Sequence, residues 1–283
     1  MRTNLHFHPV LNIVSVLTLL GLMLSIMVAG VSEAQTNSKK VEVVIDHSNK
    51  QKIKGTIHIA LAWGDQLIPP QKYIRGFFNL KEAMHRWTKI ETRIDSHLYL
   101  SSPRLLKMPF IYITTDRAFE LSKIEKKNVK KYFDSGGFMV LDNAIPAVDN
   151  SQSSTSLRKM LRDVLGAHAR FLPIPISHPF YHCFFDFDDG PPIGAELLYT
   201  NTVWKPEKNE LLNVNTSRII SEYIPRERPF LEGVFYKDRL IAVFSDKGYI
   251  IRWNDMTDNY PQLKMGVNMI VFSLIQEGGI ASQ

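Results

Sequence analysis

The chain has almost no cysteine and lacks the common nucleotide- and metal-binding motifs. Cys183 is the single cysteine among 283 residues, so no disulfide can form within the chain and its core alone must hold the fold. The sequence contains no paired-cysteine metal motif, no Gly-x-Ser-x-Gly elbow and no glycine-rich phosphate loop. These absences argue against a zinc module, a serine hydrolase with that elbow and a nucleotide-phosphate site.

The chain also carries little excess charge. Its formal net charge is +6, and charged residues make up 22% of the sequence. This balance tolerates anionic surfaces but lacks the concentrated positive charge of a nucleic-acid-binding tail, so we expect no nucleic-acid partner. Hydrophobic residues make up 45%, an ordinary globular composition for one large domain or two small ones.

The N-terminus has the pattern of an export signal. Arg2 precedes a long apolar run over residues 10–31, and Ser32-Glu-Ala34 places small residues where a signal peptidase reads them. The run is also long enough to span a bilayer, so a retained anchor is the alternative. We therefore expect residues 1–34 to be a signal peptide or an N-terminal anchor. The protein would then be periplasmic or secreted, or else membrane-anchored and associated with a membrane through the apolar run.

Residues 35–52 are polar and predict a linker, with a short strand at 41–45. From residue 53 onward, β-rich apolar runs alternate with two-faced helical patterns, which predicts a single α/β domain over 53–280. Strands are predicted at 56–63, 94–100, 109–114 and 138–141, a hairpin at 231–245 with its turn at Lys237-Asp238, and helices from Asn79, from Ser122, over 157–165 and over 265–275. The order of strand, helix and strand predicts a mostly parallel sheet, and residues 190–230 are predicted to be irregular.

The segment His178–Gly190 combines histidine, aspartate and the lone cysteine with aromatic residues. His178, His182 and Asp186 follow one another at intervals of four, and on a helix they would share a face as a metal set. Prolines and the alternation of Phe and Asp favour an extended, strand-like path that ends in a turn. A metal or catalytic role, ligand binding without chemistry and a structural turn all stay open. The candidate ligand-binding residues here are His178, His182, Asp186, Asp188 and Asp189.

Two further candidates, Asp142 and Asn143, follow the strand predicted at 138–141. Ligands of open α/β sheets bind at the carboxyl ends of parallel strands, although these side chains could equally cap the next turn. Asp116 and Arg117 have a similar place after the strand at 109–114. Cys183 is expected to be a buried, inert thiol, because no small-residue elbow surrounds it.

Five lysines share one side of the helix predicted from Ser122. They are Lys123, Lys126, Lys127, Lys130 and Lys131. Such a face is ordinarily solvated, and the alternative is a membrane-anchored scaffold that binds anionic lipid through it.

Several stretches, in this order along the chain, resemble a known family. They are Asn79–Ala83, Leu100–Thr114, Tyr132–Asp142, His178-Pro-Phe, Asp186–Pro192, Gly233-Val, Asp238–Asp246 and Met265–Leu274. Together they are similar to domain-of-unknown-function family 4159, over most of residues 53–280.

The resemblance implies a class I glutamine-amidotransferase-like fold. This is a flavodoxin-like, three-layer α/β sandwich around a mostly parallel sheet, here with an added hairpin, and it looks distantly like the trehalose-utilisation-type branch. True amidotransferases use a cysteine on a glycine-flanked elbow, paired with a histidine. This sequence has no such elbow, so glutaminase activity is not expected. The family supplies no established reaction, so no catalytic residue, metal or cofactor is assigned.

Two functions follow from these observations. The first is a non-catalytic binding or interaction module of the cell envelope, whose partner would be a small molecule or an envelope protein. The alternative is a hydrolase-like or metal-dependent sugar-modifying enzyme that uses His178, His182 and the acidic residues of 186–189.

Overall fold

A computed structural model describes residues 53–146, 150–196, 202–205, 210–213, 230–255 and 257–282. The expected signal or anchor, the linker and the strand at 41–45 lie outside these residues. Within the described ranges, no helix has both the length and the apolar character needed to cross a membrane.

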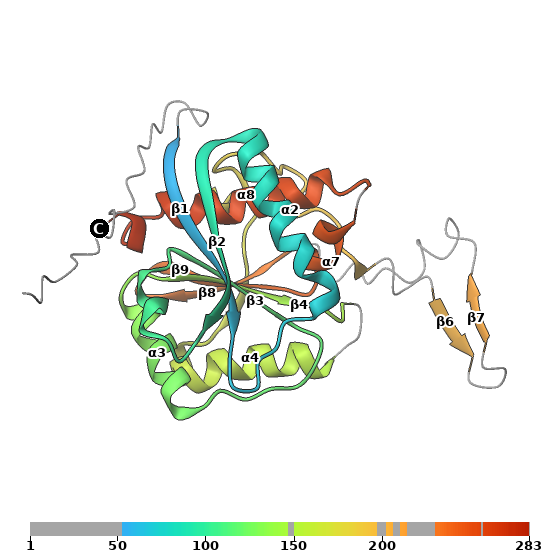
Figure 1. Ribbon diagram of the computed structural model, residues 1–283, viewed down its shortest axis with the longest axis horizontal. Coiled ribbons are helices and arrows are strands. Elements are labelled where there is room, and N and C mark those ends of the chain that lie inside the picture. Colours follow the sequence, from blue (N-terminus) through green and yellow to red (C-terminus); the bar gives the residue numbers. More distant parts are fainter. Residues whose placement is uncertain are drawn as a thin grey trace, which may run out of the picture. The chain divides into compact units, whose positions relative to one another are not determined.

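The fold is α/β and is built on one large sheet (Figure 1). Its strands are β1 (Lys54–Trp63), β2 (Lys89–Tyr99), β3 (Phe110–Thr115), β4 (Phe138–Asn143), β5 (Phe171–Pro173), β8 (Glu232–Tyr236) and β9 (Arg239–Ser245). They lie in the order β2-β1-β3-β4-β9-β8-β5. The first five in this order are parallel, and β8 and β5 extend the sheet by antiparallel pairing. The predicted class and the mostly parallel sheet are confirmed.

Helices cover both faces of the sheet (Figure 1). The helices α2 (Ile74–Trp87), α7 (Tyr249–Asn254) and α8 (Tyr260–Ile275) lie on one face, and α3 (Lys123–Asp134) and α4 (Gln152–Leu165) lie on the other. Successive side chains of a strand point to opposite faces. Accordingly, Ile59 and Leu61 of β1 join the hydrophobic cluster under α2 and α8, whereas Ala60 joins the cluster under α3 and α4.

Short 3₁₀ turns complete the described structure. They span Gln71–Tyr73, Pro103–Lys107, Gly166–His168, Pro179–Tyr181 and Ile280–Ser282. A separate two-stranded antiparallel sheet joins β6 (Thr202–Lys205) and β7 (Glu210–Asn213). The interval 190–230 was predicted to be irregular throughout, and these two strands correct that prediction.

The structure confirms several local predictions. Ser122 caps α3 in a capping box, with its backbone N–H donating to Glu125 Oε2 at 2.7 Å. The hairpin of β8 and β9 turns at Lys237 and Asp238, whose φ angles of 52° and 58° suit a tight two-residue turn. Gly166 ends α4 with a φ of 58°.

The predicted start of a helix at Asn79 is wrong. Helix α2 already begins at Ile74, and Asn79 lies inside it. The side-chain Nδ2 of Asn79 donates to the carbonyl oxygen of Trp253 at 2.8 Å. An asparagine followed by an acidic residue resembles a cap, but here the amide has a tertiary partner in α7 instead.

Candidate functional site

Asp142 is the next-to-last residue of β4 and is completely buried. Its Oδ2 accepts hydrogen bonds from the Tyr112 hydroxyl at 2.7 Å and from the Ile250 N–H at 3.0 Å. Burial raises the pKa of Asp142 to about 6, against the opposing effect of these hydrogen bonds. The carboxyl group therefore joins β3, β4 and α7 internally and is closed to solvent.

Asn143 ends β4 and is equally buried. Its Nδ2 donates to the Ile145 carbonyl at 2.9 Å and to Asp246 Oδ1 at 2.7 Å. Its Oδ1 accepts from the Ile145 N–H at 3.0 Å and from the Ser153 hydroxyl. An amide has two N–H donors and two acceptor lone pairs, so these contacts use its whole capacity. The geometry favours the capping interpretation, and a ligand role for Asp142 and Asn143 stays a prediction.

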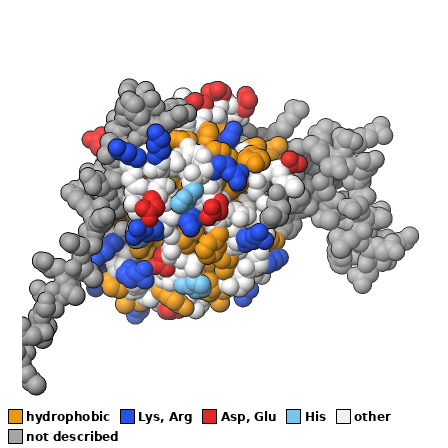
Figure 2. All heavy atoms as spheres, turned by 45° about the horizontal axis from the view of Figure 1, so that its top comes forward, with side chains coloured by type: hydrophobic (Ala, Val, Ile, Leu, Met, Phe, Trp, Pro, Cys, Tyr) orange, Lys and Arg blue, Asp and Glu red, His pale blue; other side chains and the backbone are white. Residues whose placement is uncertain are grey.

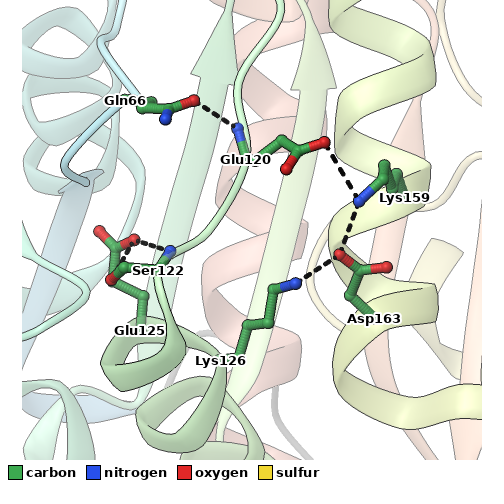
Figure 3. Close-up of polar contacts among 7 residues, drawn as sticks. All are labelled: Gln66, Glu120, Ser122, Glu125, Lys126, Lys159 and Asp163. Atoms are coloured by element: carbon green, nitrogen blue, oxygen red, sulfur yellow. Dashed lines mark hydrogen bonds and ion pairs between the residues drawn. The ribbon is translucent and has the colours of Figure 1, made fainter.

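The strand order reverses between β1 and β3, and the carboxyl ends of the strands at such a point are a common ligand site in open α/β sheets. In this protein, a buried carboxylate of the chain itself accepts hydrogen bonds from backbone N–H groups near the end of β1. The fully buried Glu125 accepts from the N–H of Asp65 at 2.8 Å and from that of Ser122. The side-chain Oε1 of Gln66 accepts from the Glu120 N–H at 3.1 Å, a contact drawn in Figure 3. After β3, Asp116 and Arg117 pair with each other at 3.3 Å.

The lysine-rich side of α3 is partly neutralised. Lys126 Nζ lies 2.8 Å from Asp163 Oδ2 (Figure 3), and Lys130 Nζ lies 2.7 Å from Asp134 Oδ2. These two ion pairs favour an ordinary solvated helix face. The face drawn in Figure 2, seen from nearer the top of Figure 1, likewise has basic and acidic side chains interspersed among hydrophobic ones.

The segment His178–Gly190 is not a strand, contrary to one of the sequence interpretations. A 3₁₀ turn is followed by bends and by a turn that ends at Gly190, where φ is 86°. Phe185 and Phe187 pack against the hydrophobic cluster while Asp186 and Asp188 are exposed, so the predicted alternation of Phe and Asp is present, but it lies on a path of bends and not on a strand.

The physical reason is that the backbone of this segment binds a side chain rather than a neighbouring strand. In α8, Asn268 Oδ1 accepts from the Phe185 N–H at 2.8 Å, and its Nδ2 donates to the Phe185 carbonyl at 2.8 Å. The Cys183 thiol donates to the Asn268 carbonyl at 3.3 Å, and the cysteine is buried as predicted.

The two histidines of this segment have different surroundings. His178 Nδ1 accepts from the Phe180 N–H at 3.1 Å. His182 Nε2 lies 2.8 Å from the Ile176 carbonyl oxygen, and its Nδ1 lies 3.3 Å from Asp186 Oδ1.

The remaining acidic residues of the segment, Asp188 and Asp189, do not form a metal site with the histidines. Asp188 Oδ1 is 3.9 Å from His182 Nδ1, and Asp189 is exposed in the turn. Nowhere in the described part of the chain do three or more His, Cys, Asp or Glu side chains gather as a metal-binding group. The spacing of four residues therefore does not assemble the metal set that a helix would have produced.

An open cavity of about 700 Å³ lies beside His178. Its lining residues come from the turn before β4, the hairpin of β8 and β9, and the C-terminal end of α8 with its cap, where they include Phe272 and Gln276. Because Gly136 and Arg239 line it, the cavity lies at the amino-terminal edge of β4 and β9. Asp142 lies further along β4, about 13 Å from the first residue of that strand at a rise of about 3.3 Å per residue. The candidate residues therefore occupy separate places in the fold.

His178 lines this cavity and carries one hydrogen-bond donor on its ring. Since Nδ1 is an acceptor, the proton of the neutral ring is on Nε2. Burial lowers the pKa of His178, which keeps the ring neutral at neutral pH. Its ring packs 6.0 Å from that of Phe235 and 5.7 Å from that of Phe272, measured between centroids.

Sequence reasoning missed three residues. Asn268 binds the backbone of the segment 178–190, and Gln276 and Arg239 line the cavity. Asn268 had a detectable signal, because an amide inside the apolar run 265–275 must find buried hydrogen-bond partners. No sequence signal pointed to Gln276 and Arg239, because they line the cavity only through the way distant elements meet in the fold.

The comparisons with known proteins agree with this description as far as they reach. No curated protein matches the chain. One family profile matches residues 70–274, well over half of the chain and most of the large sheet. The match confirms the resemblance found in the sequence motifs. The chain belongs to the family described as Domain of unknown function (DUF4159).

Proposed function

We propose that this chain is a non-catalytic binding module of the cell envelope that takes a small molecule into the cavity beside His178. The observation that supports it best is the cavity itself. Its volume of about 700 Å³ falls in the range of small-molecule sites. It combines aromatic walls with a few polar groups, which is the usual composition of such sites.

The chemistry around the cavity supports binding rather than turnover. Acyl or glycosyl transfer needs a nucleophile or an acid–base pair within hydrogen-bond reach. His178 contacts aromatic rings and a backbone N–H, and the Cys183 thiol is buried against the Asn268 carbonyl. These contacts give no support to the hydrolase-like or sugar-modifying alternative.

The amidotransferase-like fold belongs to the same proposal. Its support is the strand order β2-β1-β3-β4, parallel throughout, with helices on both faces. Glutaminase activity is not part of the proposal. Asn143 stands at the carboxyl end of β4 with its amide fully engaged, and Cys183 is in another part of the fold.

The envelope location can be tested through the N-terminus. We expect the full chain, produced in a Gram-negative bacterium with its own N-terminus, to reach the periplasm and to begin at Gln35. The reason is the small-residue site Ser32-Glu-Ala34 after the apolar run. Intact-mass measurement of the periplasmic fraction reads the cleavage. An uncleaved chain in the membrane fraction would favour the anchor, and a chain retained in the cytoplasm would contradict export.

The binding site can be tested by filling the cavity. We expect small aromatic probes to give saturation-transfer NMR signals with the full chain, and the variant Ile275→Trp to weaken their binding at least about tenfold. Ile275 lines the cavity, and the larger ring would occupy the space that the probe needs.

Ile124→Trp provides the matched control, because Ile124 is an exposed isoleucine of α3 outside the cavity lining. Its probe affinities should equal those of the wild type. The proposal fails if the wild-type chain binds no probe, or if Ile275→Trp binds them as well as Ile124→Trp does.

A further inference from the structure

The cations that line the cavity are already engaged within the protein. Arg239 Nη1 donates to the carbonyl oxygens of Gly136 at 2.9 Å and Gly137 at 3.2 Å, and its Nη2 donates to that of Phe133 at 3.1 Å. These contacts stabilise the C-terminal turn of α3. The guanidinium is therefore committed to the protein and is not offered to an anionic ligand.

The other charges at the cavity also disfavour an anion. Lys237 Nζ lies 3.5 Å from Asp134 Oδ1. The exposed side chains of Asp238 and Glu277 line the same cavity and bring two further negative charges to it. A ligand carboxylate or phosphate would face these acids with no uncommitted cation beside it.

The apolar part of the cavity is aromatic. Phe272 is 5% exposed and Phe235 is partly buried, and the ring of His178 contacts both. Aromatic rings prefer edge-to-face or offset contact with another flat ring. This corner therefore suits a planar apolar group.

Besides the exposed carboxylates of Asp238 and Glu277, two hydrogen-bond donors of the cavity lining have no acceptor among the described residues. No described residue accepts a hydrogen bond from His178 Nε2, which carries the proton because Nδ1 accepts from Phe180. One helical turn after Phe272, the buried Nε2 of Gln276 also has no acceptor among the described residues. A ligand oxygen that accepts from the half-buried His178 ring forms one new hydrogen bond, and one that reaches the buried Gln276 amide also removes the cost of an unpaired donor.

From these observations we infer that the cavity takes a molecule without negative charge that carries an aromatic ring and a carbonyl-type oxygen. The ring packs in the corner of Phe235, Phe272 and His178, and the oxygen accepts from His178 Nε2. The side-chain amide of Gln276 can turn about its torsions to supply a second donor. This inference rests on the proposed binding function and specifies its ligand class.

Four probes of similar size separate the possibilities. Acetophenone carries the carbonyl, ethylbenzene lacks an acceptor, benzoate is an anion and benzylamine is a cation. With the full chain at pH 7.5, we expect acetophenone to bind about tenfold more tightly than each of the others, the effect of one hydrogen bond to an otherwise unpaired donor. Dissociation constants come from NMR titration.

Two variants test the assigned donors. His178→Phe keeps an aromatic ring and removes the N–H, and Gln276→Met keeps the length of the chain and removes the amide. His178→Phe should bring acetophenone to within about threefold of ethylbenzene, while ethylbenzene affinity stays unchanged. Gln276→Met should reduce the same preference in part. His85→Phe, at an exposed position of α2, is the control and should behave as the wild type.

The outcomes are distinct. If no probe binds, the proposed function itself fails. If all four bind equally, or if benzoate or benzylamine binds most tightly, the function stands and the ligand class is wrong. If acetophenone is preferred but neither variant changes the preference, the assignment of His178 and Gln276 is wrong.

Discussion

Replacing Asn268 with leucine is expected to lower the free energy of unfolding by about 3–5 kcal/mol. The leucine fills a similar volume but leaves the partly buried N–H and carbonyl of Phe185 without their partner, and a buried polar group without a partner costs about 1–3 kcal/mol. The Phe180 carbonyl also loses a weaker contact from the Asn268 amide at 3.4 Å. We expect the segment 180–187 to detach from α8 before the rest of the chain unfolds.

Urea unfolding and hydrogen exchange of the full chain measure the two parts of this prediction. Exchange should accelerate in peptides that contain the Phe185 amide and change little in β3 and β4. Met269→Leu is the matched control, because Met269 is the fully buried neighbour in α8 and its replacement conserves volume. A loss for Asn268→Leu no larger than for Met269→Leu would mean that the amide does not anchor the segment.

Replacing Asp142 with asparagine is expected to stabilise the protein at high pH and to change little at low pH. The pKa of Asp142 is raised from 3.8 to about 6 in the folded protein by burial. A raised pKa gives stability that is fully present below about pH 4 and lost as the pH rises through 6. The difference of about two units corresponds to about 3 kcal/mol, which asparagine, uncharged at every pH, would not lose.

The neighbouring groups do not interfere with this comparison. Tyr112 and Tyr249 face Asp142, and burial raises the pKa of both hydroxyls above its ordinary value of 10, so they stay protonated from pH 4 to 8. An asparagine oxygen can still accept from the Tyr112 hydroxyl and the Ile250 N–H. The Ser245 hydroxyl is close enough to lower the pKa of Asp142, and it offers an acceptor to the new amide.

Chemical denaturation of both proteins between pH 4 and pH 8 provides the test. Asp142→Asn should exceed the wild type by up to about 3 kcal/mol at pH 8, and the difference should vanish near pH 4. A control variant, Asp142→Leu, removes the acceptor and should be less stable than Asp142→Asn at every pH. A difference between wild type and Asp142→Asn that does not vary with pH would contradict a titrating Asp142.

The capping box at Ser122 and the two-residue turn at Lys237-Asp238 could be predicted because each depends on residues within a few positions. The error at Asn79 has the opposite cause. Its pattern resembles a cap, yet the amide binds Trp253, which is 174 positions away in the sequence. No local pattern contains that partner.

The candidate site shows the same difference between features set by local sequence and features set by tertiary contacts. Alternating apolar patterns were enough to predict an α/β fold and a buried Cys183, because burial of apolar surface depends mainly on residue type and period. The path of His178–Gly190 was decided by tertiary structure, since it follows from hydrogen bonds to Asn268. The cavity beside His178 exists only because a helix end, a hairpin and a turn meet there. Contacts between distant parts of the chain leave no period in the sequence, and only the folded structure brings them together.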